Sequence, residues 1–273
     1  MSMKKRALQI ALFLVIMLMT FYALFSGRDL SEIGHALMNM SFLYLVPSIA
    51  LAVFFVCAEG FMIWYLLRSM KAHKEGYKAS SLSRCIQYSF IGFFYSGITP
   101  SATGGQPVQL YYMNKDGNRG SDSTVVLMTV AVAYKFVLVV MGLGILLFWI
   151  NPLRQELGNY FPLYLLGLAL NVILVILILG VMLFPKVILK LALLFEGLFI
   201  RLKIWKPSEK REEKINDFID SYQRAVTWLK VHKGSLAVVI LVTFLQRCSV
   251  FVLTYMVYLG FGLHGAGAMK VIL

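Results

Sequence analysis

Five long apolar runs constrain this chain more than any other feature of its sequence. They cover residues 7–25, 41–67, 124–150, 161–184 and 235–260. About 20 apolar residues are enough for a helix to cross the hydrocarbon core of a bilayer. Of the 273 residues, 59% are hydrophobic and only 14% are charged. The chain is therefore predicted to be an all-α polytopic membrane protein, a single integral membrane domain with about five full spans.

The basic residues predict the orientation of these spans. Most of the 26 Lys and Arg residues lie in segments 1–6, 68–84, 114–123 and 185–234, whereas segments 26–40 and 151–160 carry one each. By the positive-inside rule the basic segments, and with them the N-terminus, are expected to be cytoplasmic. The first run lacks a following cleavage site and is predicted to be an uncleaved span. The net charge of +13 indicates contact with anionic lipid, and no nucleic-acid partner is expected.

One polar stretch interrupts an apolar part of the chain. Residues 97–112 read Gly-Ile-Thr-Pro-Ser-Ala-Thr-Gly-Gly-Gln-Pro-Val-Gln-Leu-Tyr-Tyr, and the prolines and glycines cannot continue a helix. With basic segments on both sides, residues 85–113 must begin and end in the cytoplasm, and each arm of about 14 residues is too short to cross. We predict a re-entrant helical hairpin with its tip at 99–105. Broken backbone in a membrane must be enclosed by protein or line a watery cavity.

Three charged residues lie inside the apolar runs, namely Glu59, Lys135 and Arg247. Counted from the cytoplasmic ends of their runs, they lie about 12, 17 and 18 Å deep. Charges at such depth usually face a bundle interior or a cavity. We predict a net positive cavity, roofed by the hairpin, that holds a lipid phosphate with help from free N–H groups at Gly104 and Gly105. The candidate substrate-binding residues are Glu59, Thr99, Ser101, Thr103, Gly104, Gly105, Gln106, Lys135 and Arg247.

Each of these signals also has a purely structural interpretation. Glu59 and Lys135 could form an ion pair that joins two helices. Arg247, with Gln246, could extend to the membrane surface or bond to freed carbonyls of the hairpin. The Gly104-Gly105 pair could allow close helix packing.

The remaining segments carry weaker signals. Residues 151–160 are predicted to form a turn around Asn151-Pro152. Within the cytoplasmic insert 185–234, apolar residues at helical spacing predict an amphipathic helix on the membrane surface or on a partner; they are Ile215, Phe218, Ile219, Tyr222, Val226 and Leu229. Cys57, Cys85 and Cys248 are odd in number and far apart, so they are interpreted as buried thiols. The histidines are scattered too, and no metal or cofactor is expected.

Several of these features together resemble a known family. They are the basic-flanked first span, Glu59 shortly before Trp64-Tyr65-Leu66-Leu67, and the cytoplasmic insert. Most specific is the hairpin, Thr99-Pro100-Ser101-x-x-Gly104-Gly105-x-Pro107, followed by Leu110-Tyr111-Tyr112. The chain resembles the lysylphosphatidylglycerol synthase transmembrane family, the flippase-like membrane domain of the multiple peptide resistance factor. The resemblance implies a bacterial inner-membrane protein that moves lipids between leaflets, with aminoacylated phosphatidylglycerol as the cargo of full-length relatives. Only the Thr99 to Pro107 hairpin matches a family motif.

The chain also departs from that family. Full-length synthases attach lysine with a soluble acyltransferase domain, and no segment here is long or polar enough to be one. The family usually continues with further spans, so we expect C-terminal spans to be lacking. Lipid translocation is the favoured function, with anionic or aminoacylated phospholipids as partners; a homo-oligomer is left open. The alternatives are a phosphatidylglycerol lysyltransferase or headgroup-modifying enzyme subunit with Glu59 as base, and a scaffold whose partner docks on residues 206–233.

Overall fold

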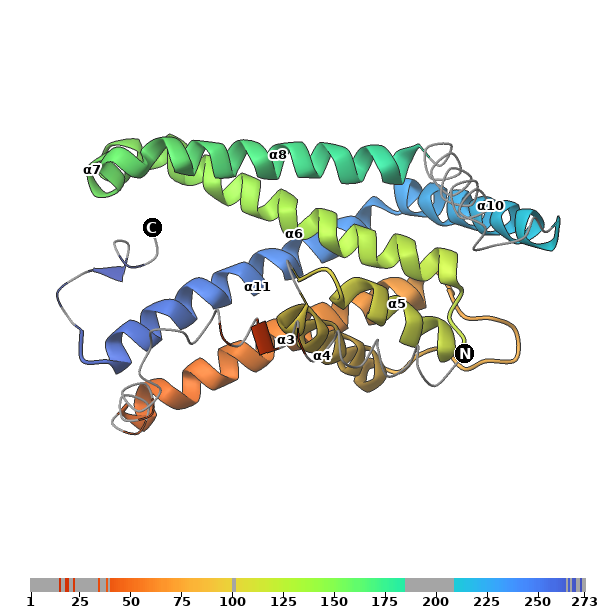
Figure 1. Cartoon of the computed structure of the whole chain (residues 1–273), viewed down its shortest axis with the longest axis horizontal. Coiled ribbons are helices and arrows are strands. Elements are labelled where there is room, and N and C mark those ends of the chain that lie inside the picture. The colour runs from red at the N-terminus through yellow and green to blue at the C-terminus, as the bar shows by residue number, and fades with distance from the viewer. Residues whose placement is uncertain are drawn as a thin grey trace.

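The structure, a computed structural model, describes residues 40–99, 102–184 and 209–263, with isolated positions before and after them; over 209–215 it describes only the backbone. Every regular element in these ranges is a helix (Figure 1). In chain order they are α3 (Phe42–Ser69), α4 (Leu82–Ile98), α5 (Gly105–Lys115), α6 (Gly120–Phe148), α7 (Ile150–Leu157), the 3-10 helix η2 (Gly158–Tyr160), α8 (Phe161–Leu183), α10 (Glu209–Val231) and α11 (Lys233–Gly260). The prediction of an all-α fold is confirmed.

Four segments of the described chain are long and apolar enough to cross a membrane. They are α3, α6, the continuous segment Ile150–Leu183 that contains α8, and α11. Helices α3, α6, α8 and α11 coincide, within a few residues at each end, with the predicted runs 41–67, 124–150, 161–184 and 235–260. The predicted first span, 7–25, and residues 185–208 of the insert lie outside the described residues. The chain is therefore an all-α membrane protein.

The predicted turn at Asn151-Pro152 is wrong, because these residues belong to the short helix α7. Pro152 lies in the first turn of α7, where a backbone N–H has no partner within the helix. The backbone departs from helical geometry on both sides of α7, at Trp149 and at Gly158, whose φ is +47°. A positive φ favours glycine over residues that carry a Cβ. The chain then passes through η2 into α8.

The helices pack unequally around α6 and α11. These two cross the middle of the molecule, and α8 runs along one edge (Figure 1). Helix α3 packs along α11 and α4, whereas α8 packs chiefly on α6. The largest cluster of buried side chains joins α3, α4, α6, α10 and α11, and includes Leu66, Tyr88, Val126, Tyr222 and Val239. The core therefore lies where the ends of α3, α10 and α11 meet α6.

Helix α10 is amphipathic as predicted, but its apolar side does not lie on a membrane surface or a partner. Ile219, Tyr222 and Val226 are only 5%, 0% and 4% exposed, and α10 packs against α6. The Tyr222 hydroxyl donates a hydrogen bond to the Met182 carbonyl at 3.4 Å. That prediction is wrong, because the protein itself covers the apolar side of α10 over the described side chains.

Helices α4 and α5 form the predicted helical hairpin and pack against each other. Ser81 caps the start of α4, since its hydroxyl accepts a hydrogen bond from the Arg84 N–H at 3.2 Å. The arms have 17 and 11 residues, fewer than a crossing needs. Where the arms meet, a Cβ on Gly105 would contact the Ser96 hydroxyl and lie 2.7 Å from the Gly92 carbonyl oxygen. Gly105 therefore permits close packing, and the re-entrant position of the hairpin stays a prediction.

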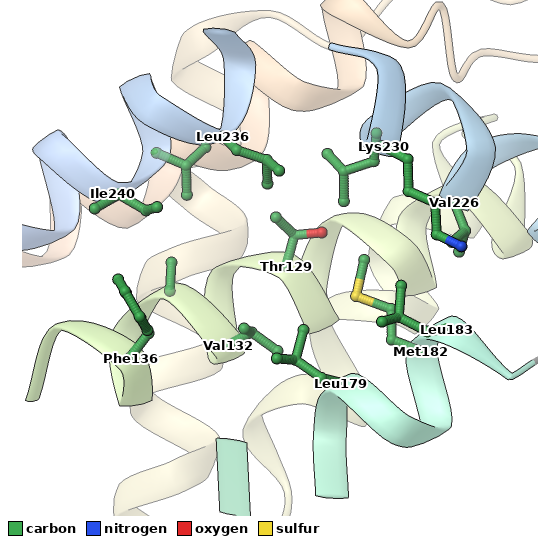
Figure 2. A pocket seen from close by; sticks show the side chains of 13 residues that line it. Thr129, Val132, Phe136, Leu179, Met182, Leu183, Val226, Lys230, Leu236 and Ile240 are labelled. Carbon is green, nitrogen blue, oxygen red and sulfur yellow. The ribbon is translucent and has the colours of Figure 1, made fainter. Parts of the chain in front are cut away.

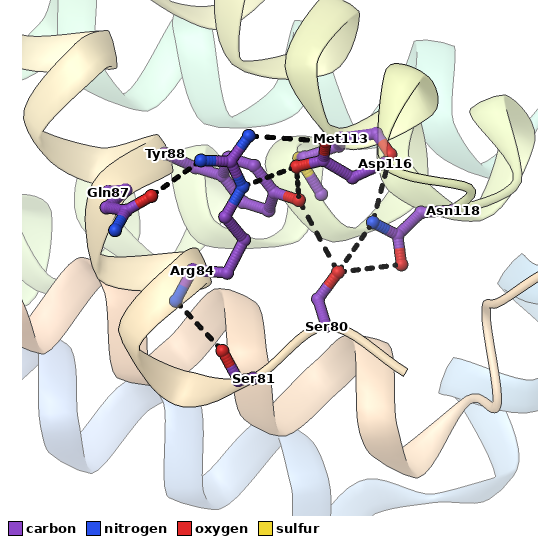
Figure 3. A network of polar contacts seen from close by, with 8 residues as sticks. All are labelled: Ser80, Ser81, Arg84, Gln87, Tyr88, Met113, Asp116 and Asn118. Carbon is purple, nitrogen blue, oxygen red and sulfur yellow. Dashed lines mark hydrogen bonds and ion pairs between the residues drawn. The ribbon is translucent and has the colours of Figure 1, made fainter. Parts of the chain in front are cut away.

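A polar cluster ties the two ends of the hairpin together (Figure 3). The Asp116 carboxylate, just after α5, accepts hydrogen bonds from Arg84 Nε at 2.6 Å and Nη2 at 3.2 Å. It also accepts one from the Tyr88 hydroxyl at 2.6 Å. Ser80 and Asn118 extend the cluster, with the Asn118 side-chain amide donating to Ser80 at 2.9 Å. We call this group of five residues the hairpin clamp.

The hairpin clamp predicts a pH-dependent stability. Hydrogen bonding by Arg84 lowers the pKa of the Asp116 carboxyl below its ordinary value of 3.8. The carboxylate therefore stabilises the fold above pH 3.8, and this contribution is lost as pH falls through the lower, folded-state pKa. Because Asp116 and Arg84 side chains are 24% and 39% exposed, Asp116→Asn is expected to destabilise the protein at pH 7 by about 0.5–1 kcal/mol.

Thermal unfolding of the detergent-purified protein between pH 7 and pH 3 measures this effect. The difference between the midpoints of wild type and Asp116→Asn should shrink as the pH falls below 3.8. Asp217→Asn, on the exposed face of α10, is the matched control and should follow wild type throughout. If Asp116→Asn is as much less stable than wild type at pH 3 as it is at pH 7, the charge of the carboxylate is not the source of the stabilisation.

Candidate functional site

A partly open cavity of about 330 Å³ lies between α3, the hairpin, α6 and α8. Its volume far exceeds the roughly 10–15 Å³ that one water molecule needs. Polar groups from four helices face it, and the polar lining side chains are Glu59, Ser96, Gln106, Gln109, Tyr134 and Lys135. We call this space the polar cavity. In a chain of apolar helices, such a cavity is the place where a charged or polar molecule can be accommodated.

Glu59 joins α3 to the hairpin. Its Oε1 atom accepts a hydrogen bond of 2.7 Å from the Gln109 side-chain amide of α5. Gln109 is 3% exposed and lies directly against Gly92 of α4, where any added Cβ would overlap it. The glycine on α4 therefore makes room for the amide that holds the carboxylate.

Lys135 lines the same cavity from α6. Its amino nitrogen lies 5.4 Å from the ring centroid of the neighbouring Tyr134. Within the described residues, the ion pairs are Arg84–Asp116 and Arg119–Asp122, so the alternative of a Glu59–Lys135 pair is not realised. Two opposite charges thus face one space without neutralising each other directly.

Arg247 of α11 is buried, with 6% of its surface exposed, so the alternative in which it extends to the membrane surface is wrong. Its guanidinium carbon lies 3.7 Å from the ring centroid of Tyr134 and 4.7 Å from that of Phe55. It is close enough to attract Glu59 electrostatically, and its Nε atom is buried without a hydrogen-bond partner among the described residues. Gln246 donates to the Phe55 carbonyl of α3 at 2.6 Å, not to the hairpin.

Arg247 is therefore a neighbour of the polar cavity and not part of its lining. Tyr134 belongs to the lining, and Arg247 reaches the cavity through contact with that ring. The charged groups that line the cavity are the carboxylate of Glu59 and the ammonium group of Lys135, and the guanidinium group of Arg247 lies behind Tyr134. Lys135 is the cation that faces the open space.

The turn of the hairpin is held by its own residues. The Thr99 hydroxyl donates to the Tyr95 carbonyl at 2.7 Å and accepts from the Gly104 N–H at 2.9 Å. The prediction that the Gly104 N–H is a free donor is therefore wrong, although α5 begins at Gly105 as that prediction required. Ala102 lines the cavity with a φ of +56°, which is uncommon for a residue with a Cβ.

Of the nine predicted site residues, the structure brings Glu59, Gly105, Gln106 and Lys135 together around the polar cavity. Thr99 and Gly104 shape the turn, Thr103 lies exposed on it, and Ser101 lies outside the described residues.

Sequence reasoning missed Gln109 and Tyr134. Gln109 could have been found, because it follows Gly105 by four residues and Gln106 by three and so shares their side of a helix. Tyr134 carried no signal that separates it from other membrane aromatics.

Comparison with known proteins identifies a family of membrane proteins, in agreement with the apolar helical fold. The family profile described as "Lysylphosphatidylglycerol synthase TM region" matches residues 7–273. Comparison with curated proteins and with solved structures gives no significant match. The profile extends over almost the whole chain and includes both the spans and the hairpin. The chain therefore belongs to the lysylphosphatidylglycerol synthase transmembrane family, a family of membrane proteins with a lipid-related function.

Proposed function

We propose that this chain moves a phospholipid between the leaflets of the bacterial inner membrane, with the lipid headgroup held in the polar cavity. The observation that carries the proposal is that Glu59 and Lys135 line one partly open cavity without forming an ion pair with each other. Charges inside membrane helices are costly and are usually paired or bind a ligand. These two remain available to a molecule that enters the cavity.

The charges match a phospholipid headgroup. Lys135 suits a lipid phosphate, because an ammonium group donates charge-assisted hydrogen bonds to phosphate oxygens. Glu59 suits a cationic substituent, such as the ammonium groups of an aminoacylated phosphatidylglycerol. Arg247 contributes positive charge from behind Tyr134 without touching the cavity. The site therefore favours an anionic or an aminoacylated phospholipid over an uncharged one.

The cavity also fits the physics of translocation. A headgroup alone in the hydrocarbon core would lose its hydration without replacement, which is strongly unfavourable. A polar cavity replaces part of that hydration, and because the cavity is partly open, the acyl tails can stay in the surrounding lipid. A cytoplasmic N-terminus, a re-entrant hairpin and a cavity that opens toward the cytoplasmic leaflet all belong to this proposal.

Reconstitution of the full chain into liposomes tests the proposal. Liposomes of phosphatidylcholine and phosphatidylglycerol carry a trace of phosphatidylglycerol with a fluorescent label on one acyl chain, and dithionite quenches the outer leaflet. Wild type should expose the inner-leaflet probe much faster than protein-free liposomes do. Lys135→Gln should slow this step by about tenfold or more, because one desolvated charge-assisted hydrogen bond is worth about 1.5–3 kcal/mol.

Lys78→Gln is the matched control, since Lys78 is an exposed lysine in the segment between α3 and α4. It should translocate the probe at the wild-type rate. The proposal fails if wild type is no faster than protein-free liposomes, or if Lys135→Gln is as fast as wild type while retaining the wild-type unfolding temperature.

A further inference from the structure

Helix α6 has two different sides, and only one of them faces the polar cavity. Leu127, Val130, Ala131 and Tyr134, at i, i+3, i+4 and i+7, line that cavity. Thr129, Val132, Ala133 and Phe136 repeat the same spacing on another side of the helix and line a second pocket, between α6, α8, α10 and α11. Because these two sets point in different directions around the helix axis, the second pocket is a separate site.

The second pocket is almost entirely apolar (Figure 2). Its volume is about 140 Å³, close to that of an engineered apolar cavity of ~150 Å³ that stays dry and binds benzene. Among its lining residues only Thr129 and Lys230 have hydrogen-bonding side chains. The Thr129 hydroxyl donates to the Val125 carbonyl at 2.7 Å and is not available to a ligand. A hydrocarbon segment of about six carbons suits this space, and ordered water does not.

The pocket has a closed floor and an apolar mouth. Met182, Val226 and Val239 are 3%, 4% and 0% exposed, whereas Phe136 and Ile240 are 41% and 37% exposed. In a membrane protein, exposed apolar side chains on spans such as α6 and α11 face lipid tails. An acyl chain of a surrounding lipid can therefore enter from the bilayer.

Lys230 adds one positive charge to the lining of this apolar pocket. It lies in the last turn of α10, exposed, and makes no ion pair in the described part of the chain. The span α11 begins three residues later, at Lys233. Leu236 and Ile240, which line the pocket, lie only about 5 and 10 Å further along that helix. Lys230 therefore lines an apolar pocket close to the start of a span, where lipid headgroups are expected.

We propose that this pocket is a second lipid site, which binds one acyl chain of an anionic phospholipid while Lys230 contacts its phosphate. The bound lipid joins α10 to α6, α8 and α11 and so anchors the cytoplasmic helix to the spans. The site is independent of the translocation proposed above, since it shares no lining residue with the polar cavity.

Photolabelling of the full chain in liposomes tests this site. The probes are phosphatidylglycerol and phosphatidylcholine, each with a diazirine in one acyl chain, and labelled peptides are identified by mass spectrometry. The phosphatidylglycerol probe should label pocket residues of α6 and α11 up to about fivefold more than the phosphatidylcholine probe, the effect of one basic residue near an anionic lipid. Labelling of the exposed side of α8 is the reference for bulk lipid.

Two pairs of variants separate the acyl chain from the headgroup. Ala133→Phe, which fills the pocket, should lower pocket labelling by both probes, whereas Ala169→Phe on the exposed side of α8 should not. Lys230→Gln, a surface change that leaves the core intact, should abolish the preference for phosphatidylglycerol, whereas Lys233→Gln should retain it. Equal labelling by the two probes in wild type, no effect of Ala133→Phe, or equal losses in Lys230→Gln and Lys233→Gln would each overturn the proposal.

Discussion

Arg247→Leu is expected to destabilise the folded chain by about 2–4 kcal/mol, the range for losing two desolvated cation–π contacts at about 1–2 kcal/mol each. Arg247 is 6% exposed and its guanidinium group lies against the rings of Tyr134 and Phe55. It is also the cation that attracts Glu59. Leucine removes this attraction and both cation–π contacts. Denaturation of the detergent-purified protein measures the loss of stability.

A double-mutant cycle with Glu59→Gln identifies the cause. If Arg247 acts mainly as the countercharge of Glu59, the double variant should be more stable than the sum of the single variants predicts, by about 1–3 kcal/mol. The amide introduced by Glu59→Gln is neutral and needs no countercharge, and its carbonyl oxygen can still accept the hydrogen bond from Gln109. Additive losses would instead show that the ring contacts dominate. Arg224→Leu, at an exposed arginine of α10, is the control and should change stability by less than about 0.5 kcal/mol.

Gly60→Ala is expected to destabilise the protein by about 1–3 kcal/mol, because a single methyl group would overpack the contact between α3 and α4. A Cβ on Gly60 would lie 2.6 Å from the Ile86 Cα atom and 2.9 Å from its backbone nitrogen. Backbone atoms cannot rotate away as a side chain can, so the two helices must separate. Because Gly60 follows Glu59, separation also disturbs the Glu59–Gln109 hydrogen bond, and translocation should fall with stability.

Gly167→Ala provides the matched control on α8. No heavy atom lies within 4 Å of a Cβ built there, and alanine is the better helix former by about 0.5–1 kcal/mol. The two substitutions should therefore shift the thermal midpoint in opposite directions. A Gly60→Ala midpoint at or above that of wild type would mean that the α3–α4 contact is looser than the structure shows.

Several features of the protein follow from its sequence because local physics determines them. Bilayer thickness sets the length of a span, so apolar runs alone placed α3, α6, α8 and α11 to within a few residues. A cluster of prolines and glycines within a few residues disfavours a continuous helix, and this placed the hairpin turn between α4 and α5. Counting along their helices placed Glu59 and Lys135 well inside the spans, within about 5 Å of each other in depth, and both line the polar cavity.

Other features depended on which helices are neighbours and how each is rotated about its axis. Hydropathy identifies a helix that can cross a membrane. When such a helix is apolar on every side, its sequence does not indicate which side contacts other helices. Only the packed structure shows that Gln109 contacts Glu59 and that Arg247 lies behind Tyr134. It also shows that the apolar side of α10 packs on α6, and that α6 lines one polar and one apolar pocket. The sequence determined the membrane class, the spans and the hairpin, because these depend on length and local backbone preference. The tertiary structure decided which charges meet, because contacts between distant segments depend on the arrangement of all the helices together.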